Sequence, residues 1–364
     1  MRCDRLNITK LQYALMRILI TGATGFIGRG LIRHLLGEKN NQIIALTRKN
    51  TLQPKGVKWI SSIDEISARD TIDAIINLGG APISKRWTKR YKLELINSRL
   101  NSLDQIFQIV DKLETKPNLL ISASAVGYYG NQGASWLSEE AMPHLSSKSS
   151  LKQIFSRKVT SSNKIMLEEE AMPHLSSKSS LKQNFSRKVR SSNKIKQRDD
   201  FTHELCKRWE AAALEAQKYG LRVCIARLGV VLGASGGIIA RLLPLFKLGL
   251  GGKIGKGDQY ISWIHLNDVI SAFQHFINQP KSSGIYNLVS PKPITSIEFT
   301  KAFSTQLKKP AIFNVPAIGI KLIYGEMGQS LLLNSQRVSP SKLLAEGFKF
   351  EHFSIQSALN EIIK

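Results

Sequence analysis

Three glycines at a spacing of three residues, Gly22, Gly25 and Gly28, follow a short β-branched run that ends at Thr21. A segment with helical apolar spacing continues directly after them to Leu36. Glycine allows a tight turn and a close approach of the backbone to a ligand, and the free amides at the start of a helix attract negative charge. The pattern predicts a strand, a glycine loop and a helix that bind the diphosphate of a dinucleotide, with a plain turn as the simpler alternative.

The next predicted strand, residues 42–46, ends in a hydroxyl and a cation, Thr47 and Arg48. A site that prefers NAD has Asp or Glu at this place, about twenty residues after the loop, where it binds the ribose hydroxyls and repels a 2′-phosphate. Arg48 can pair with a phosphate through two hydrogen bonds, and Thr47 can add another. NADP(H) is therefore the predicted cofactor, and a solvated arginine at a strand end is the alternative.

Strands and helices alternate along much of the chain. The segments with the composition of strands are residues 17–21, 42–46, 71–78, 118–122 and 221–225. Their alternation with helical segments predicts an α/β fold, a Rossmann-type doubly wound parallel sheet, in which ligands bind at the carboxyl ends of the strands. We divide the chain into a disordered extension over residues 1–15, an NADP-binding Rossmann domain over residues 16–242 and a smaller C-terminal substrate lobe over residues 243–364.

A duplicated basic segment interrupts the Rossmann domain. Residues 139–165 recur at 169–195 with two differences, Ile154 to Asn184 and Thr160 to Arg190. Much of the formal net charge of +25 lies here, because residues 145–198 are rich in Lys and Arg. Serine and lysine dominate and aromatic residues are sparse, so we interpret residues 144–198 as a flexible insertion rather than a nucleic-acid-binding arm.

Three cysteines and seven histidines show no metal-ligand spacing, which predicts no metal site and fits a reducing cytoplasm. The longest apolar runs fall short of the ~20 residues that a membrane-spanning helix requires. The expected partner is a small-molecule substrate, with no nucleic acid and no membrane.

Several motifs together resemble those of the extended short-chain dehydrogenases/reductases, the superfamily of the nucleotide-sugar epimerases. The chain looks most similar to the atypical "epimerase family" proteins of the YfcH type, including their C-terminal module. The motifs are TGATGFIG from Thr21, INLGGAPI from Ile76, SASAVGYYG from Ser122, RLGVVLG from Arg227, SWIH from Ser262 and GFKF from Gly347. By analogy with the extended class, the resemblance also suggests a homodimer.

The expected cofactor contacts come from two sources. The glycine loop contributes Gly22, Thr24, Gly25, Phe26, Ile27 and Gly28. The resemblance implies further contacts from Thr47, Arg48, Leu78, Gly79, Glu94, Arg99 and Val231.

The catalytic residues depart from the superfamily. Typical members use a Ser at the end of the fifth strand and a YxxxK pair, in which Lys lowers the pKa of Tyr. Aligning Glu210 with the acidic residue that usually follows that Lys by four puts Thr202 at the Tyr position and Cys206 at the Lys position. Neither residue can replace its counterpart, so the standard mechanism is in doubt.

Ser124 and Tyr129 are the candidate catalytic residues. Ser124 is the preferred polar contact for a substrate, although the hydroxyl can equally cap a turn. Tyr129, or its neighbour Tyr128, is the candidate proton donor, although a Tyr-Gly pair at this place also shapes the substrate wall. His265 can titrate near neutrality, but a packed structural donor is the preferred interpretation.

The sequence therefore predicts an NADP(H)-binding, epimerase-like oxidoreductase that acts on a small polar molecule, with a sugar nucleotide as one candidate. The alternative is a nonenzymatic NADP(H)-binding sensor or regulatory protein, which the missing YxxxK motif favours.

Overall fold

The computed structural model describes residues 16–37, 41–48, 54–143 and 200–363. The predicted extension over residues 1–15 and the predicted insertion over residues 144–198 lie outside the described residues.

A seven-stranded sheet forms the centre of the molecule, and every neighbouring pair of its strands is parallel. In spatial order the strands are β12 (Gly284–Leu288), β7 (Arg222–Leu228), β5 (Leu119–Ala125), β4 (Ala74–Asn77), β1 (Met16–Thr21), β2 (Asn41–Leu46) and β3 (Val57–Ile60). The chain moves outward in opposite directions from β1 and β4, so a topological switch point lies between them. The predicted Rossmann-type doubly wound sheet is confirmed.

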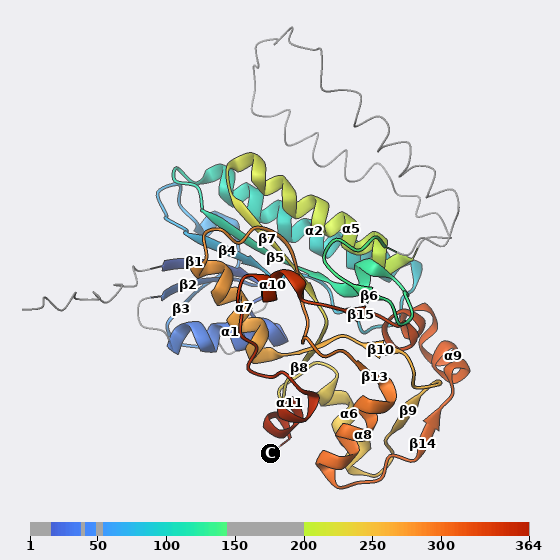
Figure 1. Cartoon of the computed structure of the whole chain (residues 1–364). Helices are drawn as coiled ribbons and strands as arrows, with labels where there is room; N and C mark the ends of the chain where they lie inside the picture. The colour runs from blue at the N-terminus through green and yellow to red at the C-terminus, as the bar shows by residue number, and fades with distance from the viewer. Residues whose placement is uncertain (1–15, 38–40, 49–53, 144–199, 364) are drawn as a thin grey trace, which may run out of the picture.

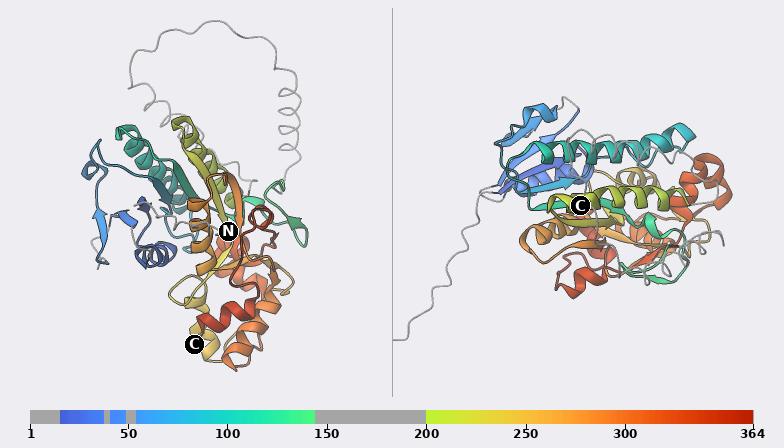
Figure 2. Two further views of the ribbon diagram at one scale, coloured as in Figure 1. Left: turned by 60° about the vertical axis from the view of Figure 1, so that its left-hand side comes forward. Right: turned by 90° about the horizontal axis from the view of Figure 1, so that it is seen from above.

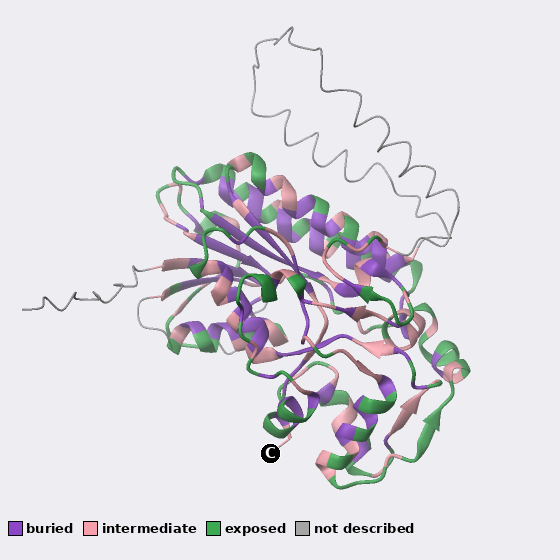
Figure 3. Cartoon of the chain, viewed as in Figure 1, coloured by how far each residue is buried: buried purple, intermediate pink, exposed green. Residues whose placement is uncertain are grey.

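Helices cover both faces of this sheet, as its strands require. Residues Ile18 to Ile20 of β1 are apolar and almost fully buried, which is typical of parallel strands packed on both sides. Helices α2 (Lys89–Lys112) and α5 (Phe201–Leu214) lie side by side on one face (Figures 1 and 2). Helices α1 (Phe26–Gly37) and α7 (Leu266–Asn278) pack on the other, and the buried strands separate the two layers (Figure 3).

The remaining elements form short connections and a C-terminal lobe. The connections are the 3-10 helices η1 (Ile63–Glu65), η2 (Val126–Tyr129) and η3 (Glu215–Tyr219) and the strand β6 (Trp136–Leu137). The lobe and the C-terminal segment contain β8 (Val230–Leu232), α6 (Ile239–Lys247), β9 (Gly252–Ile254), β10 (Tyr260–Ile261), β11 (Trp263–His265), β13 (Ile294–Thr295), α8 (Ser296–Leu307), β14 (Phe313–Val315), α9 (Ala317–Gly328), the π-helix η4 (Gln329–Leu333), β15 (Arg337–Val338), α10 (Ser341–Ala345) and α11 (Ile355–Ile362).

The predicted boundary between the Rossmann domain and the C-terminal lobe, at residues 242 and 243, is wrong because the central sheet continues beyond it. After α6, the chain returns to the Rossmann layer as α7 and then as β12, which pairs with β7 along its whole length. A buried strand of five residues has too little periodicity to be told from other short apolar runs, so the sequence did not reveal this return.

No helix among the described ranges combines the length and apolar character needed to cross a bilayer.

Candidate functional site

The glycine loop presses directly on the end of strand β4. Gly22 has a φ of +68°, and a Cβ there would lie 2.4 Å from the carbonyl oxygen of Leu78. A Cβ on Gly28 would lie 2.5 Å from the carbonyl oxygen of Gly22. Both contacts are with backbone, which cannot move aside, so only glycine fits these two positions.

Helix α1 starts with amides that its own backbone does not use. The amide of Gly25 donates to the carbonyl of Gly22 at 2.9 Å, and that of Arg29 donates to the carbonyl of Gly25 at 3.0 Å. The amides of Phe26, Ile27 and Gly28 lie before the first bond of the helix and so have no acceptor within it. This is the arrangement that binds a phosphate or diphosphate.

A buried polar network holds the β4 end against the loop. The hydroxyl of Thr21 donates to Asn77 Oδ1 at 2.7 Å, and that of Ser102 donates to the same oxygen at 2.8 Å. The Gly79 amide donates to the Thr21 hydroxyl at 3.2 Å. Asn77 and Ser102 were not singled out from the sequence, because their partners come from three different elements.

The Thr47 and Arg48 pair lies at the same edge of the sheet as the glycine loop. Strands β1 and β2 run in register, with Thr21 opposite Leu46, so Thr47 and Arg48 follow immediately beyond the strand end. Thr47 is half-buried and its amide donates to the carbonyl of Ile60, whereas the Arg48 side chain is exposed. Arg48 is therefore accessible to a ligand at this edge.

Arg99 on α2 is a buried cation. Its exposed fraction is 8%, its Nη1 donates to the carbonyl of Leu95 at 2.9 Å, and its guanidinium stacks on the ring of Trp209. Burial lowers its pKa, and its Nε has no hydrogen-bond partner. Among the described residues no carboxylate forms an ion pair with it, so the guanidinium lacks a compensating anion.

The other residues implied by the resemblance differ in placement. Leu78 and Gly79 touch the glycine loop, and Glu94 is exposed on α2. Val231 is half-buried in β8, where a Cβ on Gly237 would lie 2.8 Å from its carbonyl oxygen.

A second buried network joins the carboxyl ends of β5, β7 and β12. Arg227 forms two hydrogen bonds of 2.8 Å with the carboxylate of Glu210, and Ser124 donates to the same carboxylate at 2.6 Å. Arg227 also donates to the Tyr129 hydroxyl at 3.0 Å, and Tyr129 donates to Asn287 Oδ1 at 2.8 Å. Burial opposes the charge of Arg227, but its hydrogen bonds to Glu210 raise its pKa.

Both candidate catalytic side chains, Ser124 and Tyr129, are hydrogen-bonded within this network. Tyr129 is 0% exposed with its hydroxyl bonded on both sides, and burial raises its pKa. Ser124 is 2% exposed. Tyr128 is only half-buried; its ring lies 3.5 Å from the Arg227 guanidinium, and its carbonyl accepts a hydrogen bond from His203. Of the two neighbouring tyrosines, Tyr128 is the accessible one.

Thr202 and Cys206 lie on α5, below the end of β5. The Thr202 hydroxyl donates to Asp200 at 2.5 Å, within the cap of the helix. The Cys206 thiol points at the carbonyl of Ala125 at 3.6 Å, and burial raises its pKa to about 12. The thiol is therefore neutral at physiological pH and supplies no charge in place of the missing lysine.

His265 belongs to a separate cluster near the C-terminus. Its Nδ1 accepts the amide of Asn267 and caps α7, and its ring stacks on His352 at 3.8 Å between centroids. The Nε2 of His352 bonds to Glu361 at 2.6 Å. The potential ligand atoms of the two histidines and Glu361 lie within 4.8 Å of one another, a proximity that sequence spacing did not reveal. The Asn267 side chain donates to Glu361 at 3.0 Å, and the amides of Glu351 and His352 donate to Asp268, so these bonds tie the C-terminal segment to α7.

The parallel sheet, its switch point and the glycine loop define an NAD(P)-binding protein with a Rossmann-type fold. The sequence model of the NAD dependent epimerase/dehydratase family matches residues 18–155 and 198–288, and the chain belongs to this family. A second model, Domain of unknown function (DUF1731), matches residues 315–362.

Relatives cover nearly the whole chain. An epimerase family protein SDR39U1 homolog of Arabidopsis thaliana is 29% identical over 96% of this chain and 87% of its own length. Epimerase family protein Mb2239 of Mycobacterium bovis is 31% identical over 94% of this chain and 96% of its own length. The crystal structure of human epimerase family protein SDR39U1 with NADPH is similar at a TM-score of 0.73 and 26% identity, and covers 95% of this chain and 99% of that one.

Proposed function

We propose that this chain binds NADP(H) at the carboxyl ends of β1, β2 and β4 and acts as an epimerase-like oxidoreductase on a small polar substrate. The observation that carries the proposal is the contact of Gly22 with the Leu78 carbonyl, which leaves a cradle of backbone next to the free amides of α1. The NADPH in the structure of the human relative supports the choice of cofactor.

The described residues fit such a cofactor in several places. Thr24, Gly25 and the amides of Phe26 to Gly28 would hold the diphosphate. Thr47 and Arg48 would hold the 2′-phosphate. Arg99, whose Nε is unpaired, would gain an anionic or polar partner, and Leu78, Gly79, Glu94 and Val231 would lie along the remaining length.

When bound, a nicotinamide cofactor supplies hydride exchange with a carbon of the substrate. The chain itself must position the substrate and move the proton. We assign Ser124 and Tyr129 to fixing the wall of the site, because both hydroxyls are bound within the Glu210–Arg227 network. Tyr128, held over the Arg227 guanidinium and half-exposed, is the phenol placed to meet a substrate.

Titration calorimetry with NADPH and NADH tests the cofactor preference. A charge-assisted bond to the 2′-phosphate contributes about 1.5–3 kcal/mol, so NADPH should bind on the order of 10- to 100-fold more tightly. Arg48→Asp should remove this preference. Arg69→Asp, which changes an exposed arginine away from the glycine loop, should leave it unchanged.

Two results would overturn parts of this proposal. Equal affinity of the unaltered protein for the two coenzymes would defeat the preference for NADP(H). Absence of heat with either coenzyme, in folded protein, would defeat the binding site as a whole.

A nonenzymatic NADP(H)-binding sensor is the second candidate, and the neutral, buried Cys206 in place of the lysine favours it. Oxidation of bound NADPH on addition of metabolite pools separates the two. An enzyme should oxidise the bound NADPH in at least one pool, and Tyr128→Phe should reduce the rate of that oxidation while leaving the fold unchanged. A sensor should bind NADPH and leave it unchanged in every pool.

A further inference from the structure

The C-terminal lobe carries an exposed apolar surface on β14 and the outer part of α9. Its members are Ile312 (80% exposed), Phe313 (48%), Ile318 (71%), Leu322 (74%), Ile323 (63%) and Tyr324 (40%). All six are apolar or aromatic and yet exposed, and exposed apolar side chains that gather on one part of a soluble protein mark interaction sites. We refer to these six side chains as the apolar surface.

The rest of α9 is anchored to the core. Met327 is buried in the layer that contains α2 and α5, and Glu326 forms an ion pair with Lys92 at the start of α2. Ile320 is buried on the inner side of the helix. The helix is kinked at Gly325, whose φ is +59°; the residues after the kink and Ile320 before it contact the core, while Leu322 and Ile323 are exposed.

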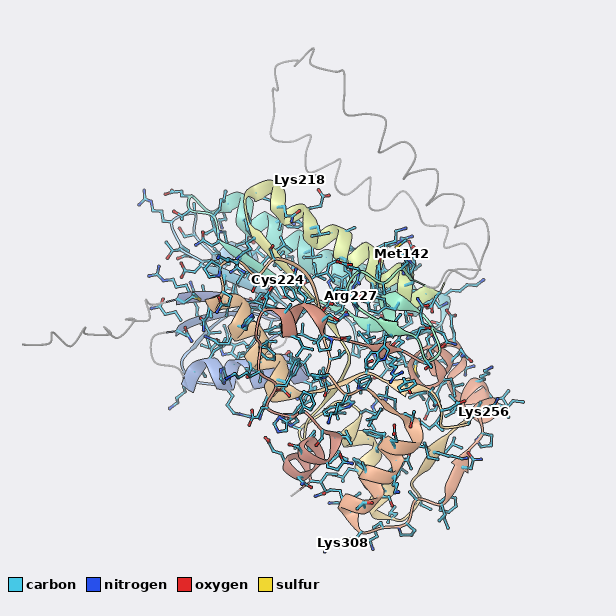
Figure 4. All side chains as sticks on the ribbon, in the orientation of Figure 1. Met142, Lys218, Cys224, Arg227, Lys256 and Lys308 are labelled. Carbon is cyan, nitrogen blue, oxygen red and sulfur yellow. The ribbon has the colours of Figure 1, made fainter. Side chains whose placement is uncertain are left out.

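The charge around the apolar surface is positive. Residues 308–324 contain three lysines and no acidic residue, and Lys308, Lys309 and Lys321 are all exposed. Lys256 is exposed in the turn after β9, the strand that pairs with β14, and Asp258 follows it. Figure 4 shows Lys256 and Lys308 at the outer rim of this lobe, far from Lys218 at the opposite end of the molecule.

This combination selects among the possible occupants. A second copy of the chain would bring the lysines of both lobes together, and Glu326, the acidic residue of α9, already pairs with Lys92 within each copy. An anionic lipid surface complements both features, because apolar side chains enter the headgroup–acyl boundary while lysines meet the phosphates. Tyr324 belongs to an aromatic type that is enriched at that boundary.

We propose that the apolar surface docks the protein on an anionic phospholipid bilayer. The apolar side chains insert only to the level of the headgroups, so no spanning helix is needed. The expectation of no membrane partner rested on the lack of a spanning segment, and a shallow surface contact does not conflict with that lack. Docking places the C-terminal lobe next to the lipid.

Co-sedimentation of the full chain with lipid vesicles tests the proposal. The probes are phosphatidylcholine vesicles with and without about 30% phosphatidylserine, at low salt. The unaltered protein should sediment with the anionic vesicles only. Each exposed lysine near the surface contributes about 1 kcal/mol, so Lys309→Gln with Lys321→Gln should weaken partitioning by about 5-fold for each lysine.

Replacing the apolar members should have a larger effect. Leu322→Glu with Ile323→Glu should lower partitioning by at least about 10-fold, because each carboxylate opposes both insertion and the anionic lipid. Leu344→Glu, an exposed apolar position on α10, and the pair Lys55→Gln with Lys218→Gln are the matched controls and should partition as the unaltered protein does. Circular dichroism should show all variants folded, since every position is exposed.

Three outcomes would overturn the proposal. Unchanged binding of the Leu322→Glu, Ile323→Glu variant means that another part of this basic chain binds the lipid. Equal losses in the lysine controls mean that net charge alone is responsible. A dimer in sedimentation velocity that the same double variant converts to a monomer, with no vesicle binding, would make the apolar surface a contact between copies.

Discussion

The buried ion pair between Glu210 and Arg227 allows a quantitative test of the architecture at the strand ends. Their side chains are 6% and 2% exposed, and two hydrogen bonds of 2.8 Å join them. Removing one partner of such a pair leaves an uncompensated buried charge, which costs about 3–5 kcal/mol of the free energy of unfolding. We therefore expect Glu210→Gln and Arg227→Met each to destabilise the protein by about that amount.

The double variant measures the interaction energy between Glu210 and Arg227, apart from their contacts with other residues. Replacing both residues removes the stranded charge, so the double variant should lose less than the sum of the two single losses, with a coupling energy of about 1–3 kcal/mol. Chemical denaturation followed by circular dichroism gives the midpoints and slopes. The exposed pair Glu215 and Lys218 serves as control, and Glu215→Gln with Lys218→Met should change stability by less than about 1 kcal/mol.

The same experiment has a clear refuting result. If Glu210→Gln costs no more than the exposed control, or if the single losses simply add, the network is not what holds Ser124 and Tyr129. The assignment of those residues to fixing the wall of the site would then fail, because their hydroxyls would be held by other contacts.

Three further predictions follow from individual residues. Gly22→Ala should abolish NADPH binding in calorimetry and destabilise the fold by at least about 1 kcal/mol, because the φ of Gly22 is +68° and the added Cβ would meet backbone atoms. Gly37→Ala, with nothing within 4 Å of the added Cβ, should have neither effect. A Gly22→Ala variant that still binds NADPH would refute the close approach of the loop to β4. Burial raises the pKa of Cys206 to about 12 and that of Cys224 to about 11. Peptide mapping after treatment with iodoacetamide at about pH 8 should therefore find both cysteines unmodified until the protein unfolds. Labelling of either cysteine in the folded protein would contradict its burial. Burial lowers the pKa of His265 from 6.5 to about 4, so on acidification the unfolded state binds a proton before the folded state does. The free energy of unfolding should therefore be constant above about pH 6.5 and fall by at most about 3 kcal/mol as the pH approaches about 4. His265→Asn keeps a capping oxygen without titrating and should flatten this profile of denaturation midpoint against pH; an unchanged profile would assign the effect to other groups.

The parts of the protein that depend on local pattern were readable from the sequence. The glycine loop is one example, because its turn is closed by local hydrogen bonds, from the Gly25 amide to the Gly22 carbonyl and from the Arg29 amide to the Gly25 carbonyl. The buried strands are another, since a parallel sheet covered on both faces requires continuous apolar runs such as residues 18–20. The α/β class and the place of the loop followed from these features, and the family resemblance followed from several motifs along the chain. The structure and the comparisons confirm them.

Contacts between distant residues were decided by the tertiary structure alone. Tyr129 and Asn287 are 158 positions apart, and the hydrogen bond between them uses the Tyr129 hydroxyl, which the sequence analysis predicted as a proton donor. The return of β12 to the sheet and the unpaired Nε of Arg99 depend equally on how layers meet. A sequence records which side chains exist and their local periodicity, but burial and partners depend on which surfaces the folded chain brings together. That is why the binding loop was predictable and the closed network beside it was not.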